Sequence, residues 1–356
     1  MVALRIGSND DGAVTLAAER FNRHTFWCGQ SGSGKTYALG VVLEQLLLHT
    51  RLPLLVLDPN ADFVGLGQPR EGADPADAAA IAEAGVRVLH STQEGGERLH
   101  VRFVDMPLRS RAAVLRLDPV ADPEEFNALL RGERDGTAQD PDLIATLRAS
   151  GDPARERVAT RIENLGSLEW DLWARGALAA EDVIDERPRA TVMDLGGFAD
   201  PDEPKVAALA VLDHLWERRT ERRPVLIVID EAHNICPPDP STPLERALVE
   251  RVVQVAAEGR KFGLWLLLST QRPSKIHVNV LSQCDNLALM KLSSPRDLAE
   301  LSDLFGYAPA DLLARAPRFR KGQGLFAGGF IEQGSLVQMA DRITREGGGD
   351  VPVPVS

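Results

Sequence analysis

Cysteine is scarce in this sequence. The 356 residues include three cysteines, Cys28, Cys236 and Cys284, which lie far apart and form no C-x-x-C pair. Disulfide bonds and a zinc site are therefore not expected, and the composition fits a reducing cytosol. The N-terminus also lacks a basic stretch followed by an apolar run, so no secretory signal peptide is predicted.

Long apolar runs are missing as well. The most apolar runs, LPLLVLD at 52–58 and FGLWLLLST at 262–270, are far shorter than a membrane-spanning helix and are typical of buried strands. We therefore expect a cytoplasmic protein with no membrane partner.

Positive charge is in deficit, because 40 Lys and Arg residues against 52 Asp and Glu residues give a formal net charge of −12. Such a chain is poorly suited to coating DNA non-specifically, since this requires many cationic contacts with phosphates. Net charge says little about a local cationic channel, because charge can be segregated on one face.

Strand-like apolar runs alternate with amphipathic helical segments before residue 107 and after residue 187. This alternation predicts an α/β fold with a mostly parallel sheet covered by helices on both faces. Between 107 and 187 the segments have helical period, which predicts an inserted helical subdomain. Strands are expected at 2–7, 12–18, 24–28, 52–58, 85–90, 99–106, 190–198, 224–230 and 263–271. The expected division is 1–106 and 188–346 for the core, 107–187 for the insertion and 347–356 for a flexible tail.

The stretch GQSGSGKT fits the phosphate-loop pattern G-x-x-x-x-G-K-[ST] at every fixed position. Its glycines let successive backbone N–H groups point at phosphate oxygens, and the following helix offers the positive end of its dipole. Lys35 can then reach the β- and γ-phosphates, and Thr36 can hold Mg²⁺. A chance glycine-rich turn is the alternative. The predicted nucleotide-binding residues are Gly29, Gln30, Ser31, Gly32, Ser33, Gly34, Lys35 and Thr36.

A second motif, VLIVIDEAHN, ends an apolar run in two acids. Asp230 at a strand end can support Mg²⁺, and Glu231 can activate an attacking water. The alternative is an ordinary acidic strand end. We interpret His233 as a hydrogen-bonding neighbour, because no other histidine lies at metal-ligand spacing.

Two further positions extend this pattern. Gln271, in LLLSTQRPSKI, follows another apolar run and can contact the γ-phosphate or the attacking water, although a surface amide is the alternative. Arg260, in EGRKFG, is either an arginine finger, often supplied by a neighbouring subunit, or a cation at a helix end.

The ordered series GQSGSGKT, LVLDPN, VIDEAH, EGRKFG, STQRPSKI, LSQCDN and DRITREGGG resembles the HerA branch of the HerA/FtsK superfamily, over about residues 21–349. The resemblance implies a RecA-like core, a hexameric ring, ATP and Mg²⁺ as cofactors, and DNA translocation. It implies that Gln271 senses the γ-phosphate and that Arg260 acts in trans. It also places Asp58 near the phosphates, as a further metal ligand.

The sequence departs from that family in two ways. Relatives of this kind usually begin with a β-barrel domain that docks a nuclease, and a phosphate loop starting at Gly29 leaves no room for one. Asn60 and Asp62 stand where the family more often has histidine and glutamate. A nuclease or a defence effector is the partner that the resemblance suggests.

Two loops are expected to face the ring pore, at 235–243 and 274–282. The first has no Lys or Arg, and the second offers Lys275 and His277 as DNA contacts. The main hypothesis is a ring translocase or helicase acting on DNA, in repair or anti-phage defence. A scaffolding ATPase assembled around an effector is the alternative, and a secretion ATPase is a weaker one. The late segment 334–349 is expected to form a strand and then lie on the adjacent subunit.

Overall fold

A 12-stranded sheet forms the centre of the molecule. The computed structural model describes residues 2–92, 96–137, 140 and 142–348. The order of the strands in the sheet is β2-β1-β12-β11-β10-β3-β9-β8-β4-β7-β5-β6. Their bounds are β1 (Ala3–Asn9), β2 (Gly12–Ala17), β3 (His24–Cys28), β4 (Leu54–Asp58), β5 (Val86–His90), β6 (Glu97–Arg98), β7 (Ala190–Asp194), β8 (Val225–Ile229), β9 (Leu264–Thr270), β10 (Cys284–Leu289), β11 (Gln323–Gly328) and β12 (Ser335–Met339).

The strands from β10 to β6 run parallel to their neighbours. At the other end of the sheet, β11, β12, β1 and β2 form an antiparallel extension. Every residue of β3, β4 and β8 is buried, as expected for parallel strands covered on both faces. The predicted α/β fold with a mostly parallel sheet is therefore confirmed.

Helices cover the two faces of the sheet with separate apolar cores. Val56 of β4 packs in the same cluster as Leu39 of α1, whereas the next residue, Leu57, packs with Leu209 of α8 and Val252 of α9. This alternation follows from the period of two along a strand. The helices outside the insertion are α1 (Lys35–His49), α2 (Pro75–Ala82), α8 (Glu203–Glu217), α9 (Pro243–Glu258), α10 (Val278–Leu281), α11 (Pro295–Leu304) and α12 (Ala310–Ala314).

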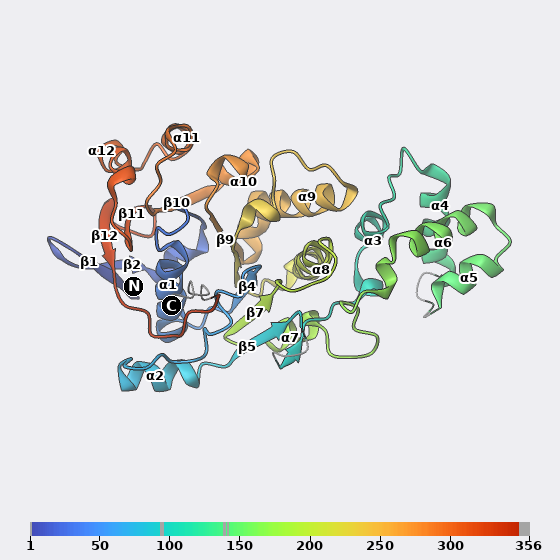
Figure 1. The fold of residues 1–356 in the computed structure, drawn as a ribbon, viewed down its shortest axis with the longest axis horizontal. Helices are drawn as coiled ribbons and strands as arrows, with labels where there is room; N and C mark the ends of the chain where they lie inside the picture. The colour runs from blue at the N-terminus through green and yellow to red at the C-terminus, as the bar shows by residue number, and fades with distance from the viewer. Residues whose placement is uncertain (1, 93–95, 138–139, 141, 349–356) are drawn as a thin grey trace, which may run out of the picture.

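Between β6 and β7 the described chain is mainly helical. It contains α3 (Leu108–Val114), α4 (Pro123–Asp135), α5 (Leu143–Ala149), α6 (Pro153–Leu165) and α7 (Ala180–Glu186). Helices α4, α5 and α6 stand together at the right of Figure 1, away from the sheet, whereas α3 contacts α8 and α9 of the core. The division into domains remains a prediction.

The expected strand at 99–106 is wrong. This segment holds a 3-10 turn at Phe103–Asp105 and a single bridge between Val101 and Trp173. Most of its apolar side chains are buried in the core cluster without extending the sheet, and the ring of Phe103 lies against that of Trp173. Strands β10 and β11 were not predicted.

The expected contact of the segment after β12 with a neighbouring subunit stays a prediction, and the segment also packs on its own chain. Residues 341–347 contact α1 and the loop after β4 of their own chain. Of the predicted flexible tail at 347–356, everything from residue 349 on lies outside the described residues. In the part of the chain that the structure describes, no helix combines the length and the apolar character needed to span a membrane.

Candidate active site

The phosphate-loop motif forms a tight turn between β3 and α1. Gly32 and Gly34 have left-handed φ angles of +73° and +84°, which glycine adopts without strain. A Cβ on Gly29 would lie 2.6 Å from the Cβ of Met290, so this position has no room for a side chain. Within the described chain, no side chain caps the N-terminus of α1. Its first backbone amides are thus available to an anion such as a phosphate.

Lys35 begins α1 and points at the ends of two neighbouring strands. Its Nζ lies 3.0 Å from Oδ1 of Asp230 and 3.3 Å from Oε1 of Glu231, and donates to Oγ of Ser269 at 2.9 Å. Burial opposes the charged ammonium, but the attraction of Asp230 and Glu231 outweighs it and raises the pKa of Lys35. Lys35 therefore stays charged although it is buried.

Glu231 follows the strand β8 in a strained backbone conformation, with φ at +43°. His233 Nδ1 lies 3.1 Å from Oε2 of Glu231 and also 3.1 Å from Oγ1 of Thr270. Burial disfavours the charged carboxylate, but contacts with His233 and Lys35 outweigh it and lower the pKa of Glu231. Glu231 is thus held as a carboxylate, with the His233 imidazole beside it.

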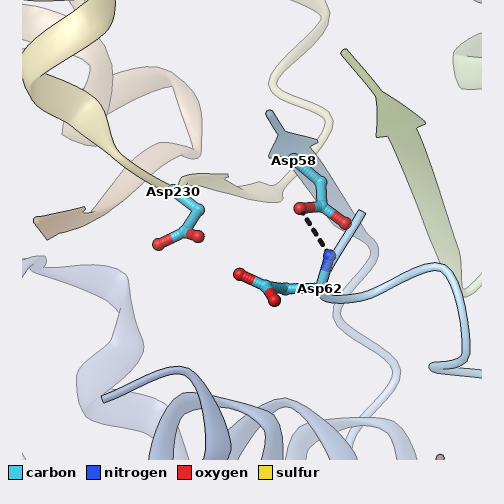
Figure 2. Close-up of side chains that lie close together, drawn as sticks. All are labelled: Asp58, Asp62 and Asp230. Carbon is cyan, nitrogen blue, oxygen red and sulfur yellow. Dashed lines mark hydrogen bonds between the residues drawn. The ribbon is translucent and has the colours of Figure 1, made fainter. Parts of the chain in front are cut away.

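Three aspartates meet beside this pair. Figure 2 shows the carboxylates of Asp58, Asp62 and Asp230 facing one another, and oxygens from all three lie within 4.8 Å of each other. Asp58 accepts hydrogen bonds from the backbone N–H of Asp62 at 3.0 Å and of Phe63 at 2.7 Å. These bonds fold the loop after β4 back over the end of its own strand.

This carboxylate cluster has the chemistry of a Mg²⁺ site. Burial raises the pKa of Asp58 to about 7 and that of Asp62 to about 6, so a cation would relieve the crowding of negative charge. Oδ2 of Asp230 is buried and has no hydrogen-bond partner among the described residues. Hard oxygen donors of this kind are the ligands that Mg²⁺ prefers. The residues therefore fit the predicted metal.

The sequence alone did not identify two residues of this site, Asp62 and Ser269. Asp62 entered the sequence analysis only as a departure from the family pattern, although its spacing of four from the strand-end Asp58 was visible. Ser269 was not considered at all. Its position at the end of an apolar run, as the first residue of the STQ that contains Gln271, is the signal that could have indicated it.

Gln271 and Arg260 lie at opposite ends of β9. Gln271 directly follows the strand and is half-buried at the same sheet edge as Lys35. Arg260 precedes the strand, where its Nη1 donates to Oδ2 of Asp285 at 2.6 Å. Because β9 has seven residues, its ends are roughly 20 Å apart. Arg260 cannot reach the phosphate loop of its own chain.

The predicted DNA contacts lie on a short segment after β9. Lys275 is exposed at the end of a 3-10 turn, Pro273–Lys275. The Nδ1 of His277 accepts a hydrogen bond from the backbone N–H of Asn279 at 3.3 Å and so caps α10. His277 therefore has a structural role as the cap of this helix.

A parallel sheet that brings a phosphate loop, a strand-end Asp–Glu pair and a buried lysine to one edge has the architecture of a RecA-like P-loop ATPase. Solved structures share this fold. The chain is similar to VirB4 of Thermoanaerobacter pseudethanolicus, with a TM-score of 0.65, 14% identity, and 95% of this chain and 96% of that chain covered. The plasmid coupling protein TrwB in complex with the non-hydrolysable ATP analogue ADPNP gives a TM-score of 0.62 at 14% identity, covering 99% and 96%.

Sequence comparison narrows the class. The family model described as "Helicase HerA, central domain" matches residues 4–131. The DNA double-strand break repair helicase HerA of Pyrococcus furiosus is 22% identical over 372 residues, which cover 90% of this chain and 66% of the relative. Matches to other curated relatives span 28% and 34% of their lengths, so the chain corresponds to less than two thirds of these proteins. The chain is therefore similar in sequence to HerA helicases and has the fold of RecA-like P-loop ATPases.

Proposed function

We propose that this chain is the subunit of a hexameric ring motor that hydrolyses ATP and translocates or unwinds DNA. The observation that carries the proposal is the buried constellation of Lys35, Asp230 and Glu231 beside an uncapped helix N-terminus. Support for DNA as the substrate comes from relatives that are named DNA double-strand break repair helicases.

The phosphates of ATP would lie in the loop Gly29–Thr36. Lys35 would exchange its contacts with Asp230 and Glu231 for the β- and γ-phosphates, which releases both carboxylates for catalysis. Thr36, Asp230 and Asp58 would hold Mg²⁺, whose charge would offset that of the phosphate oxygens.

Glu231 is the proposed general base. Its lowered pKa keeps it ionised at neutral pH, so that it can accept a proton from water, and His233 lies beside it. Gln271 lies at the same edge of the sheet, and we propose that it senses the γ-phosphate.

Arg260 is the proposed finger for the nucleotide of a neighbouring subunit. Its position at the far end of β9 leaves it useful only in trans. A head-to-tail contact of this kind, repeated around an axis, closes into a ring or grows into a filament. Light scattering coupled to size exclusion, with ATP analogue and Mg²⁺, should give a hexamer, and a strict monomer at tens of micromolar protein would contradict the trans role.

A scaffolding ATPase is the second candidate function. The loop 235–243, which faces the pore in the proposed ring, has one acid and no Lys or Arg, so the cationic lining depends mainly on Lys275. In this role the ring would assemble around a partner, such as a nuclease or a defence effector, and nucleotide would control assembly.

DNA stimulation of ATP hydrolysis separates the two candidates. A motor should hydrolyse ATP faster with DNA at low salt, and Lys275→Ala should reduce the stimulation without changing the rate measured in the absence of DNA. The exposed Lys261 supplies a matched control, Lys261→Ala. An ATPase rate indifferent to single- and double-stranded DNA would favour the scaffold.

A further inference from the structure

The segment after β12 makes contacts along its own chain that the proposed function does not explain. We call residues 340–348 the C-terminal strap. Figure 1 shows this segment, in red, passing from β12 across α1 toward β4. It connects the middle of the helix that starts at the phosphate loop with the loop that carries Asp62.

The strap is anchored on Glu44 in the middle of α1. Glu44 Oε1 lies 3.3 Å from Nε of Arg342 and accepts the backbone N–H of Thr344 at 2.9 Å, while Oε2 accepts the backbone N–H of Ile343 at 2.8 Å. The side chains of Glu44 and Arg342 are each 1% exposed. Both oxygens of this buried carboxylate are hydrogen-bonded, and these bonds hold the strap on the helix. Releasing the strap would leave the charge of Glu44 buried without a partner.

Gly40 makes this anchor possible. It lies one turn before Glu44 on α1, and a Cβ there would stand 2.5 Å from the guanidinium carbon of Arg342. A glycine inside a helix is destabilising relative to alanine. Its presence here is explained by the close approach of the arginine.

The other end of the strap lies against the loop that follows β4. The backbone N–H of Arg345 donates to the carbonyl of Gln68 at 2.9 Å, and that of Gly347 donates to the carbonyl of Asp62 at 3.2 Å. A Cβ on Gly347 would lie 1.9 Å from the carbonyl oxygen of Ala61, and one on Gly348 would lie 2.7 Å from Oδ1 of Asp62. The strap thus packs directly on the backbone of Ala61 and Asp62, which sets the position of the Asp62 carboxylate.

We propose that the C-terminal strap is a positioning element for the cation site: anchored by Arg342 on Glu44, it holds the Ala61–Asp62 turn so that Asp62 contributes its carboxylate beside Asp58 and Asp230. The inference rests on the proposed Mg²⁺–ATP site and adds to it a residue, Asp62, and a device that sets its position. Ala61 has a left-handed φ of +57°, a conformation that must be held by surrounding contacts. The strap supplies such contacts.

Gly347→Ala is the sharpest test. The added methyl group collides with the backbone of Ala61, and Gly347 does not have a left-handed φ, so alanine itself is unstrained there. Gly65→Ala pushes the strap from the other side, because its Cβ would lie 2.6 Å from the carbonyl oxygen of Arg345. Gly306→Ala is the matched control, since a Cβ there meets nothing within 4 Å.

Mn²⁺ binding is measured by loss of the free-ion paramagnetic resonance signal, with and without a non-hydrolysable ATP analogue. Both strap variants should weaken Mn²⁺ binding by about tenfold or more, the scale typical of residues that orient metal ligands. Asp62→Asn should weaken Mn²⁺ binding to the same extent. The double variant with Gly347→Ala should bind Mn²⁺ only slightly more weakly, because both changes remove the same contribution, that of the Asp62 carboxylate. Additive losses, wild-type affinity in Gly347→Ala, or an equal loss in Gly306→Ala would overturn the proposal.

Nucleotide affinity in EDTA serves as the separate readout. It should be the same within about twofold in wild-type protein and both strap variants, since the strap acts through the metal ligand. A wild-type chain that binds no nucleotide either in EDTA or with Mg²⁺ would refute the proposed function instead. The nucleotide-free Mn²⁺ titrations would then still decide whether the strap controls the carboxylate cluster.

Discussion

Lys35 and Asp230, 195 residues apart in the chain, form a buried ion pair with Nζ 3.0 Å from Oδ1. Each group neutralises a charge that would otherwise be costly at this depth. The pair joins the start of α1 to the end of β8. It therefore connects the phosphate loop to the strand that carries the proposed catalytic carboxylate.

Replacing Lys35 by alanine should abolish nucleotide binding, because the charge that would meet the β- and γ-phosphates is lost. The melting temperature should also fall, since Asp230 and Glu231 would keep their burial without the cation. Calorimetry with an ATP analogue checks the first effect and thermal unfolding the second. Wild-type affinity in Lys35→Ala would refute the phosphate-loop assignment, and Lys261→Ala should bind normally.

Glu231→Gln should bind ATP but hydrolyse it at least about 100-fold more slowly, because an amide cannot accept a proton from water. Single-turnover hydrolysis and analogue binding are measured side by side. The exposed Glu250 on α9 provides the control, Glu250→Gln. Hydrolysis at the wild-type rate in Glu231→Gln would show that the base lies elsewhere.

Arg260→Ala should slow hydrolysis by about 10³-fold if the residue is a finger. Mixing these subunits with Lys35→Ala subunits should restore part of the rate, since some interfaces then pair an intact nucleotide site with an intact finger. Rings shown to be mixed that recover no activity would argue against action in trans. Lys261→Ala, next to Arg260, tests for a general effect of lost charge.

The burial of His24 predicts that the folded state loses stability in acid. The side chain is fully buried, and burial, with a smaller effect of the nearby Arg260, lowers its pKa to about 4. The unfolded chain, with an ordinary value near 6.5, takes up a proton first as the pH falls. Folding stability should therefore decrease between about pH 6.5 and pH 4, by about 3 kcal/mol from this group.

The acid effect of His24 must be separated from that of the aspartates. The raised pKa values of Asp58 and Asp62 act in the opposite direction, since they favour the folded state as the pH falls from about 7 to 4. Denaturant unfolding of wild-type protein and His24→Gln over this pH range isolates the histidine. The difference between the two should shrink toward low pH, and a pH-independent difference would contradict the prediction.

The phosphate loop and the Asp230–Glu231 pair could be predicted from the sequence because their chemistry is local: each is a short pattern that follows an apolar strand. The parallel core was equally visible in its fully apolar strands. β10 was not, because its pairing depends on β3, which is distant in the chain. β11 was missed although its partner β12 follows it closely.

The contacts of the strap were outside the reach of pattern reasoning for a related physical reason. Arg342 and Glu44 are separated by 298 residues, and neither looks unusual in its own segment. Gly40 interrupts an otherwise helical run in the sequence, and only its packing against Arg342 explains it. The same holds for Asp62, whose role depends on where the loop after β4 folds back.

Strand β9 gives the proposed ring a mechanical property. Ser269 near its carboxyl end contacts Lys35 of the proposed nucleotide site in the same subunit, and Arg260 before its amino end is the proposed finger for the site of the neighbouring subunit. β9 is a buried central strand that is hydrogen-bonded on both sides, to β3 and β8, so it resists bending and stretching. Displacement of one end by a bound nucleotide would move the other end with it. Nucleotide binding at one site would therefore shift the proposed finger at the next site through a single strand.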